Sequence, residues 1–361
     1  MPLRIDPSRP LFGVYVHVPF CARRCDYCAF ATWTDRHHLA DRYLRACRTE
    51  IERAVAAGLP AASSVFFGGG TPSLVPAGGL VDVLAAIPVE RGAEITVECN
   101  PDTVSPALLD AYRAGGVTRL SFGVQSMVPA VLDALGRTHD PDSVVRAVAW
   151  ARAAGFATFN LDVIYGGAGE SMADWRQTFE GVLALDPPHV SAYALTVEPG
   201  TPLADDPARH PDDDDQADKY LLASSLLETA GLEWYEISNW ARPGHECRHN
   251  LLYWGQGDYL GIGCAAHSHR RGRRWWNVRT PERYIAAIEG GEPAEAGAEQ
   301  LDAATRRLEG LQLALRTSAG VPAAALADAA LPEGLLAHRG ERAVLTVKGR
   351  LLANEVALRL S

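Results

Sequence analysis

The 361-residue chain lacks the features that would place it in a membrane, on an export pathway or on nucleic acid. No apolar run approaches the roughly 20 residues that a membrane span needs. Residues 1–10 contain no apolar stretch of the kind found in a secretory signal, so we expect no export. The net charge of −10 disfavours binding through neutralised phosphates. Internal repeats and long linkers are also missing, and we expect one large domain followed by smaller units.

The chain also lacks an even set of cysteines. It has seven, and three of them are clustered as metal ligands would be. An odd number with this clustering disfavours a framework of disulfides. A reducing, cytoplasmic setting is therefore expected.

The clustered cysteines, Cys21, Cys25 and Cys28, have the spacing C-x3-C-x2-C and no fourth cysteine nearby. Three thiolates can hold three irons of a [4Fe–4S] cluster, whereas a ferredoxin-type site supplies four. The fourth iron would be open to S-adenosylmethionine (SAM), whose amine and carboxylate can chelate it. A structural zinc site is the alternative, but it would need a fourth ligand. His17 could be mistaken for that ligand, and we expect it to hydrogen-bond locally instead, while Phe30 cannot bind metal.

Short apolar segments alternate with helical patterns through the first two thirds of the chain. Strands are predicted at residues 12–18, 64–67, 94–98, 119–122, 158–164 and 190–195. Helices are predicted at residues 36–57, 106–114, 128–135, 172–185 and 217–230. This α/β pattern calls for parallel strands with helical crossovers, in an open doubly wound sheet or a partial barrel. Polar residues directly after the strands favour a partial (β/α)6 barrel, since barrel enzymes place their sites there.

The pattern changes after the predicted barrel. We expect the barrel at residues 1–240, a connecting segment at 241–300, and a small α+β, winged-helix-like domain at 301–361. In the last domain Leu308, Leu311 and Leu315 form a helical stripe, and an alanine-rich helix is expected to follow. Residues 344–352 are predicted to form a hairpin that turns at Lys348-Gly349. The acidic run at residues 210–216 is expected to be a solvated helix entry or loop.

Glycines and polar side chains follow successive predicted strands. The turn Gly68-Gly69-Gly70-Thr71-Pro72 would let the backbone approach a ligand without interference from Cβ atoms. Glu98, Gln125 and Asp162 end or follow three further strands, and burying such converging groups without a ligand would be costly. They therefore predict one polar cavity. Arg137 is expected either to contact an anion or to be a surface arginine at a helix end.

The segment His249–Trp254 is a second distinctive motif. On a helix, His249 and Tyr253 lie one turn apart. A histidine beside large aromatic rings can ligate heme iron while the rings cover the macrocycle. The alternative is a core histidine satisfied by hydrogen bonds. The basic run Arg270–Trp276 could meet porphyrin propionates or an anionic membrane, but we expect it to be an exposed hairpin tip.

Taken in order, these motifs resemble those of the radical SAM family, and specifically of oxygen-independent coproporphyrinogen III oxidases and their relatives. The motifs are Tyr15-Val-His-Val-Pro-Phe-Cys, Gly-Gly-Gly-Thr-Pro, Gly-Val-Gln-Ser and Asp-Val-Ile-Tyr-Gly. The resemblance implies that the [4Fe–4S] cluster is bound by Cys21, Cys25 and Cys28. It implies contacts to the cluster-bound SAM from Tyr15, Gly69 and Glu98. The positions that surround a second SAM in the oxidase are matched here by Gly70, Thr71, Gln125, Arg137 and Asp162.

Two features separate the branches of this family. The oxidase has a further cysteine where this chain has Phe30, and a long N-terminal extension. The motif His-Asn-x-x-Tyr-Trp marks the heme chaperone (HemW) branch, and residues His249–Trp254 match it. The resemblance thus implies heme contacts from His249, Tyr253 and Trp254, and we assign no catalytic residue.

The favoured hypothesis is a heme chaperone that binds heme and passes it to apoproteins such as respiratory cytochromes, using the [4Fe–4S] cluster and SAM. The alternative is an enzyme that oxidatively decarboxylates coproporphyrinogen III with a 5′-deoxyadenosyl radical. A radical SAM enzyme acting on an unrelated substrate is a third hypothesis, since a fold does not fix a function. The sequence leaves open whether the chain contacts a membrane peripherally and whether it forms a homodimer.

Overall fold

The computed structural model of the chain describes residues 11–327 and 329–360. Residues 1–10, where no secretory signal was expected, lie outside the described part. Within it, no helix combines the length and the apolar character needed to cross a bilayer.

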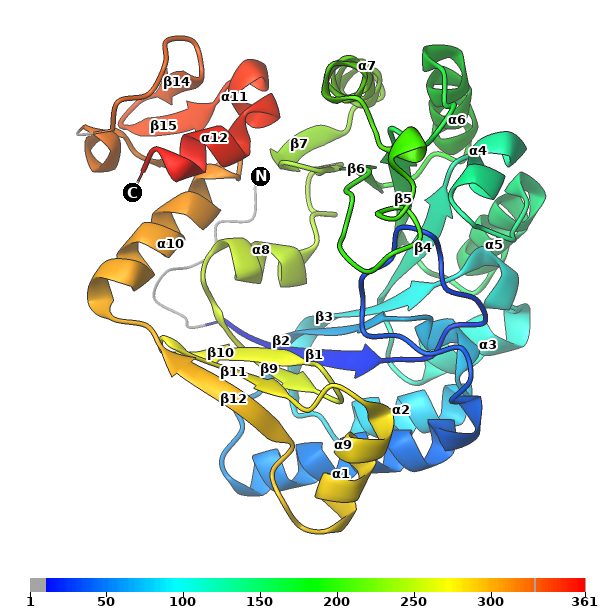
Figure 1. Cartoon of the computed structure of the whole chain (residues 1–361). Helices are drawn as coiled ribbons and strands as arrows, with labels where there is room; N and C mark the ends of the chain where they lie inside the picture. The colour runs from blue at the N-terminus through cyan, green and yellow to red at the C-terminus, as the bar shows by residue number, and fades with distance from the viewer. Residues whose placement is uncertain (1–10, 328, 361) are drawn as a thin grey trace.

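Six parallel strands form the framework of the fold, and they lie side by side in chain order. They are β1 (Phe12–Val18), β2 (Ala62–Gly69), β3 (Val89–Cys99), β4 (Arg119–Gln125), β5 (Thr158–Tyr165) and β6 (His189–Ala194). Their central residues, such as Val14, Val65 and Val97, are fully buried, as expected for a parallel sheet covered by helices. Figure 1 shows the sheet curving around an open centre with helices on its outer side. The predicted partial (β/α)6 barrel is confirmed.

Helices connect these strands on the outer face (Figure 1). They are α1 (Ala40–Ala56), α2 (Ala77–Ala85), α3 (Pro106–Ala114), α4 (Pro129–Ala134), α5 (Pro141–Ala153) and α6 (Met172–Ala184), with α7 (Asp213–Thr229) after β6. Residues four apart on α1, namely Tyr43, Cys47 and Ile51, are buried and face the core. Helices α2 and α5 were not predicted. The acidic run does begin a helix, because the Asp212 side chain accepts the N–H of Asp215 as an N-cap.

The sheet continues past β1 through four strands that the sequence patterns did not predict as a sheet. They are β9 (Asp258–Ile262), β10 (His267–Arg270), β11 (Arg273–Asn277) and β12 (Glu295–Gln300). Strand β9 pairs in parallel with the edge of β1, and the other three are antiparallel. The hairpin β10–β11 confirms the expected hairpin tip, and α9 (Pro281–Glu289) links β11 to β12. Strands β7 (Glu233–Glu236) and β8 (Asn239–Ala241) complete the opposite edge.

The C-terminal residues form a small unit with its own core, in which Leu315, Val321, Leu335 and Val356 are buried. Its elements are α10 (Ala303–Leu315), β13 (Val321–Pro322), β14 (Leu336–Arg339), β15 (Arg342–Leu345), α11 (Val347–Leu351) and α12 (Ala353–Leu358). The division of the chain at residues 240 and 300 stays a prediction. Since β9–β12 belong to the same sheet as β1, no break in the sheet occurs at residue 240.

Two local predictions in this unit were wrong. The alanine-rich segment forms only a short 3-10 turn, η5 (Ala323–Leu326), because the residues just before it pair with β15 and the chain must then return to β14. The hairpin lies one element earlier than predicted, between β14 and β15. Residues 347–351 are helical because the Thr346 side chain accepts the N–H of Gly349 and so caps α11.

Candidate functional site

The three clustered cysteines lie on the loop that leaves β1 at the carboxyl end of the sheet. All three thiols are free and half-buried. Thr71 Oγ1 donates to Cys21 Sγ at 3.6 Å, and Arg137 Nη1 donates to Cys25 Sγ at 3.5 Å. Burial raises the pKa of the Cys21 and Cys28 thiols, because apolar surroundings disfavour a thiolate. Coordination to a metal would reverse that preference, since a coordinating thiol is deprotonated.

The donor set of this loop fits a [4Fe–4S] cluster better than a single metal ion. Within the described residues, no three His, Cys, Asp or Glu side chains converge as the ligands of one ion would. In a cluster each thiolate binds a different iron, so such convergence is not required. His17 cannot be a further ligand as it stands. Its Nε2–H donates to the Ala31 carbonyl at 2.9 Å, and its Nδ1 accepts from Tyr15 Oη at 3.1 Å, which confirms the expected local hydrogen bonding.

The glycine turn after β2 packs directly against the start of the cysteine loop. Gly69 has φ +109°, and a Cβ there would lie 2.4 Å from the His17 ring. A Cβ on Gly70 would lie 2.7 Å from the Phe20 carbonyl oxygen. The amides of Gly70 and Thr71 donate to the carbonyls of Val18 and Phe20, each at 2.8 Å. The glycines are therefore required for this close approach, which fixes the cysteine loop relative to β2.

An inner cavity of about 310 Å³ lies beside this turn and is lined mainly by polar residues of the parallel strands. Among them are Glu98 and Asp162, which were predicted to converge, and also Tyr15 and Gly69. Gln125, the third residue predicted to converge, is not among the residues that line this cavity. The Gly69 amide donates to Glu98 Oε2 at 3.1 Å. Asp162 accepts from Ser121 Oγ at 2.9 Å and from Asn160 Nδ2 at 2.7 Å. Four strands thus bring a phenol, an open backbone turn and two carboxyl groups to one cavity, which suits a ligand with ammonium and hydroxyl groups.

Burial, and then the charge of Asp162, raise the pKa of Glu98 to about 8. The unfolded chain loses this proton near the ordinary glutamate value, whereas the folded chain keeps it until about pH 8. Unfolding therefore releases a proton between these values, and the free energy of unfolding falls by about 1.4 kcal/mol per pH unit across this window.

Replacing Glu98 with glutamine is expected to remove that loss of stability. Glu98→Gln should be more stable than the wild type at pH 8, on the order of 3 kcal/mol, and should lose this advantage towards pH 4.5. Urea unfolding of both proteins at a series of pH values measures the difference. Glu52→Gln, at an exposed position on α1, is the matched control. Equal pH dependence of the Glu98→Gln variant and the wild type would show that Glu98 is ionised at neutral pH.

Gln125 and Arg137 both have side-chain nitrogens close to Gly123, on β4. Arg137 is half-buried and donates to Asn100 Oδ1 at 2.9 Å and to the Gly123 carbonyl at 3.0 Å, in addition to its contact with Cys25. It is therefore not a free surface arginine. Gln125 has φ +63° in the left-handed region, and its buried Oε1 has no hydrogen-bond partner among the described residues. A strained backbone with an unpaired buried acceptor is typical of a ligand site.

The predicted helix that carries the second motif is present as α8 (Arg248–Trp254). His249 is buried, and both of its ring nitrogens are engaged: Nδ1 with Ser64 Oγ at 3.0 Å, and Nε2 with Tyr253 Oη at 2.9 Å. Its ring stacks on Phe66 with centroids 5.3 Å apart. Direct ligation of heme iron by His249 would require one of these hydrogen bonds to break. Trp254 lies apart from this stack, beneath the Arg316 guanidinium.

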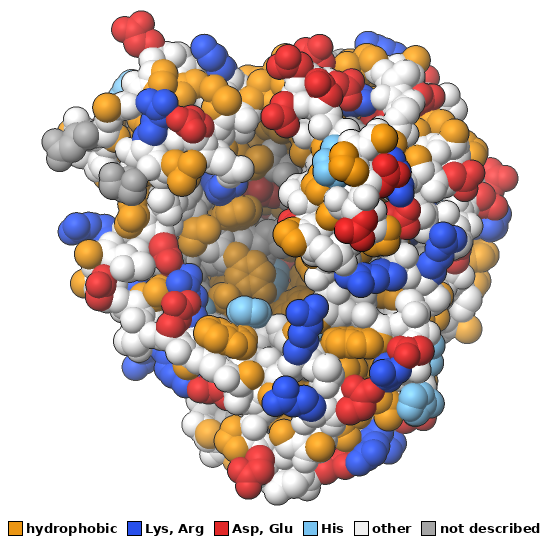
Figure 2. Space-filling model, viewed as in Figure 1, with side chains coloured by type: hydrophobic (Ala, Val, Ile, Leu, Met, Phe, Trp, Pro, Cys, Tyr) orange, Lys and Arg blue, Asp and Glu red, His pale blue; other side chains and the backbone are white. Residues whose placement is uncertain are grey.

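A larger outer pocket of about 870 Å³ opens next to the inner cavity. Tyr15, Phe30 and Tyr253 line both spaces. Figure 2 shows a hollow with hydrophobic side chains inside it and histidine and basic side chains around it. The floor comes from β9–β11, which contribute Tyr259, His267 and Trp276. The sequence patterns gave Tyr259 and His267 no role, although the alternation of His267 and His269 signals a strand with both rings on one face.

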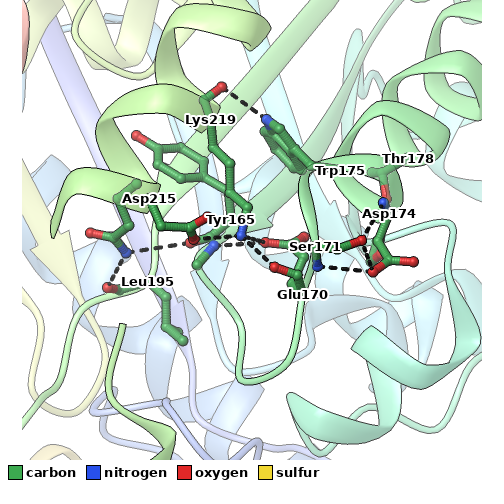
Figure 3. Close-up of polar contacts among 12 residues, drawn as sticks. Tyr165, Glu170, Ser171, Asp174, Trp175, Thr178, Leu195, Asp215 and Lys219 are labelled. Atoms are coloured by element: carbon green, nitrogen blue, oxygen red, sulfur yellow. Dashed lines mark hydrogen bonds and ion pairs between the residues drawn. The ribbon is translucent and has the colours of Figure 1, made fainter. Parts of the chain in front are cut away.

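A buried ion pair supports the loop that follows the Asp162–Gly166 motif (Figure 3). Lys219 Nζ, on α7, donates to the Glu170 carbonyl at 2.7 Å and to Asp215 Oδ2 at 2.6 Å, and it lies 3.2 Å from Glu170 Oε2. The side chains of Lys219 and Glu170 are both 0% exposed. Glu170 Oε2 also accepts the Gly166 amide at 2.8 Å. The pair therefore fastens the exit of β5 to α7.

The fold and the strand-end site define a radical SAM protein, and residues 15–182 match the model of the Radical SAM superfamily. This class implies a [4Fe–4S] cluster and SAM. The chain is 43% identical over 369 residues to the heme chaperone HemW of Mycobacterium tuberculosis, covering 97% of this chain and 94% of that protein. It is 34% identical to HemW of Bacillus subtilis, with coverages of 95% and 97%. The chain therefore belongs to the HemW family of heme chaperones.

A solved structure supports the fold independently. Coproporphyrinogen III oxidase (HemN) from Escherichia coli, a radical SAM enzyme, matches 99% of this chain and 91% of its own with a TM-score of 0.84. The sequences are 24% identical, so the likeness shows the common fold and no common activity.

Proposed function

We propose that this protein binds heme and transfers it to apo-hemoproteins, such as respiratory cytochromes, in the cytoplasm. The observation that carries the proposal is the outer pocket, whose volume lies at the upper end of the roughly 300–1,000 Å³ range of ligand pockets. Its lining combines aromatic rings with arginines, which suits a flat apolar macrocycle with anionic substituents. The names of the relatives in the family agree with this assignment.

Cys21, Cys25 and Cys28 would hold the cluster, and the family's chemistry at its open iron is the binding of SAM. Tyr15, Gly69 and Glu98 are proposed to contact that SAM, because all three line the inner cavity. Gly70, Thr71, Gln125, Arg137 and Asp162 are proposed to complete the polar surroundings. Arg137 and Thr71 each donate to a cysteine sulfur, so they also orient the loop.

The loop residues after Cys28 connect the two spaces physically. Ala29, Phe30 and Ala31 line the outer pocket, and Phe30 borders the inner cavity as well. The Phe30 side chain is 67% exposed, which is unusual for a large aromatic residue. The cysteine loop is thus a wall of the proposed heme pocket, and an ordered cluster would help to shape that wall.

The family motif on α8 is proposed to contact heme through Tyr253, which lines the outer pocket. His249 supports Tyr253 through their hydrogen bond, and Trp254 packs at the far end of the helix. The hairpin arginines are less available than their sequence suggests. Arg273 pairs with Glu295, and Arg274 pairs with Glu299 and Glu309, so the tip does not offer a purely basic surface to a membrane.

Anaerobic reconstitution followed by two assays tests the function. The protein with its cluster and SAM is expected to bind about one heme per chain, to release it to an apocytochrome, and to leave coproporphyrinogen III unchanged. Absorption spectra follow the heme, and product analysis follows the porphyrinogen. Robust decarboxylation of coproporphyrinogen III without heme uptake would contradict the chaperone function. It would support the oxidase function, which was the alternative hypothesis from the sequence.

A further inference from the structure

The floor of the outer pocket is one face of the antiparallel part of the sheet. In β10 and β11, His267 lies opposite Trp276 and His269 lies opposite Arg274. His269 is also opposite Tyr259 on β9. Side chains alternate between the two faces of a strand, so all five residues belong to the same face. All five line the outer pocket.

The described histidines around the two cavities differ in which ring nitrogens are available. Both nitrogens of His17 and both nitrogens of His249 are hydrogen-bonded. His269 Nδ1–H donates to the Gly257 carbonyl at 3.0 Å, and its Nε2 is sealed from solvent without a partner. His267 is exposed on the pocket floor, and its ring nitrogens make no hydrogen bond to another described residue. Its ring stacks on Trp276 with centroids 5.9 Å apart and an interplanar angle of 30°.

We propose that the outer pocket is the heme seat and that His267, rather than His249, supplies the imidazole ligand to the heme iron. The proposal rests on the proposed function and specifies the site at which it takes place. An imidazole that is reachable, unpaired and held by stacking can bind iron without losing an existing contact. His249, by contrast, would lose a buried hydrogen bond and leave Ser64 or Tyr253 unpaired.

Charge around the pocket fits the two propionates of heme. Arg279 and Arg283 line the pocket, and their guanidinium groups have no ion-pair partner within the described part of the chain. The other arginine in the lining, Arg274, is already neutralised by Glu299 and Glu309. Arg279 and Arg283 thus keep their positive charge at the pocket although the whole chain has a net charge of −10. Their side of the pocket therefore suits a ligand with two negative charges. The exposed Phe30 ring offers apolar contact to the macrocycle.

Heme titration of the full-length, cluster-reconstituted protein tests the iron ligand. His267→Ala is expected to weaken heme binding by about tenfold or more and to change the spin state of the iron, seen in the Soret band and by electron paramagnetic resonance. His267→Gly should regain the wild-type spectrum when free imidazole is added, which a merely structural role would not produce. His338→Ala, at an exposed position on β14, is the control and should bind as the wild type does.

The other outcomes separate the seat from the function. If His267→Ala binds heme as tightly as the wild type does, while His249→Ala loses heme binding, the proposed heme site would be wrong. The proposed function would still stand. Absence of heme binding by the wild type would overturn both. If His267→Ala fails to fold, the double variant Arg279→Glu/Arg283→Glu tests the proposed heme site instead. The double variant should bind heme at least about tenfold more weakly than the wild type does. It should bind heme dimethyl ester, whose propionate groups are uncharged, as the wild type does. An equal loss of affinity for both ligands would contradict the proposed heme site.

Discussion

Cys25→Ser is expected to abolish the [4Fe–4S] cluster, lowering the iron content after reconstitution from about four per chain to near zero. Three thiolates hold three irons, and the described surroundings offer no replacement ligand. His17 is committed to Tyr15 and Ala31, and the residue at the pocket side of the loop is Phe30. A serine hydroxyl is a far poorer ligand for iron than a thiolate. The brown absorbance and the paramagnetic signal of the reduced cluster should disappear together.

Cys99→Ala is the control for this change. Cys99 is buried on β3 and lies outside the cysteine loop, so its loss should leave the iron content unchanged. A cluster that persists in Cys25→Ser with full iron content would refute the ligand assignment. Because Ala29–Ala31 follow the triplet directly and line the outer pocket, the same variant is also expected to bind heme more weakly.

Lys219→Met is expected to cost about 3–5 kcal/mol of the free energy of unfolding. The change leaves the Glu170 carboxyl group buried without its cation and removes a donor from the Glu170 carbonyl (Figure 3). Burial already raises the pKa of Glu170, and Lys219 opposes that rise. Without Lys219 the pKa of Glu170 rises further, so the stability lost should grow as the pH increases above the ordinary glutamate range.

The chain provides a matched control for this experiment, since it contains only one other lysine. Lys348 is exposed on α11, and Lys348→Met should change stability little. Glu170→Gln combined with Lys219→Met should recover part of the loss, because no buried charge then remains. Thermal and urea unfolding measure all three variants. A loss below about 1 kcal/mol in Lys219→Met would show that the buried pair does not fasten β5 to α7.

The parallel core was predictable because each strand contains a short apolar run. Asp162 was expected at a strand end and instead lies inside β5. Glu98, Gln125 and Asp162 were expected to converge, and the topology of parallel strands brings Glu98 and Asp162 to one cavity, whereas Gln125 is not among its lining residues. The C-terminal hairpin was misplaced because Val344-Leu-Thr-Val reads as a continuing strand. A single cap by Thr346 instead starts a helix there. Whether this segment becomes a strand or a helix depends on one local hydrogen bond, and the spacing of apolar residues does not reveal that bond.

The outer pocket was not predictable from motifs. Its floor depends on β9 joining the edge of β1, a pairing between distant segments for which the sequence carries no local signal. The same pairing turns His267 from an unassigned residue into a pocket residue. Conversely, His249 stood out in the sequence, and the structure shows that its ring is satisfied internally. A conspicuous motif therefore does not by itself show which ring nitrogen is available to a ligand.

The pairing of β1 with β9 also has a consequence for synthesis on the ribosome. Strand β1 begins at Phe12 and β9 only at Asp258, whereas β2 follows from Ala62. At elongation rates of roughly 5–20 residues per second, β9 emerges on the order of 10–50 s after β1. Throughout that interval one edge of β1, and the approach to the cysteine loop from the side of the outer pocket, stay uncovered. The order of translation thus leaves the three thiols accessible from that side until the last strands are synthesised.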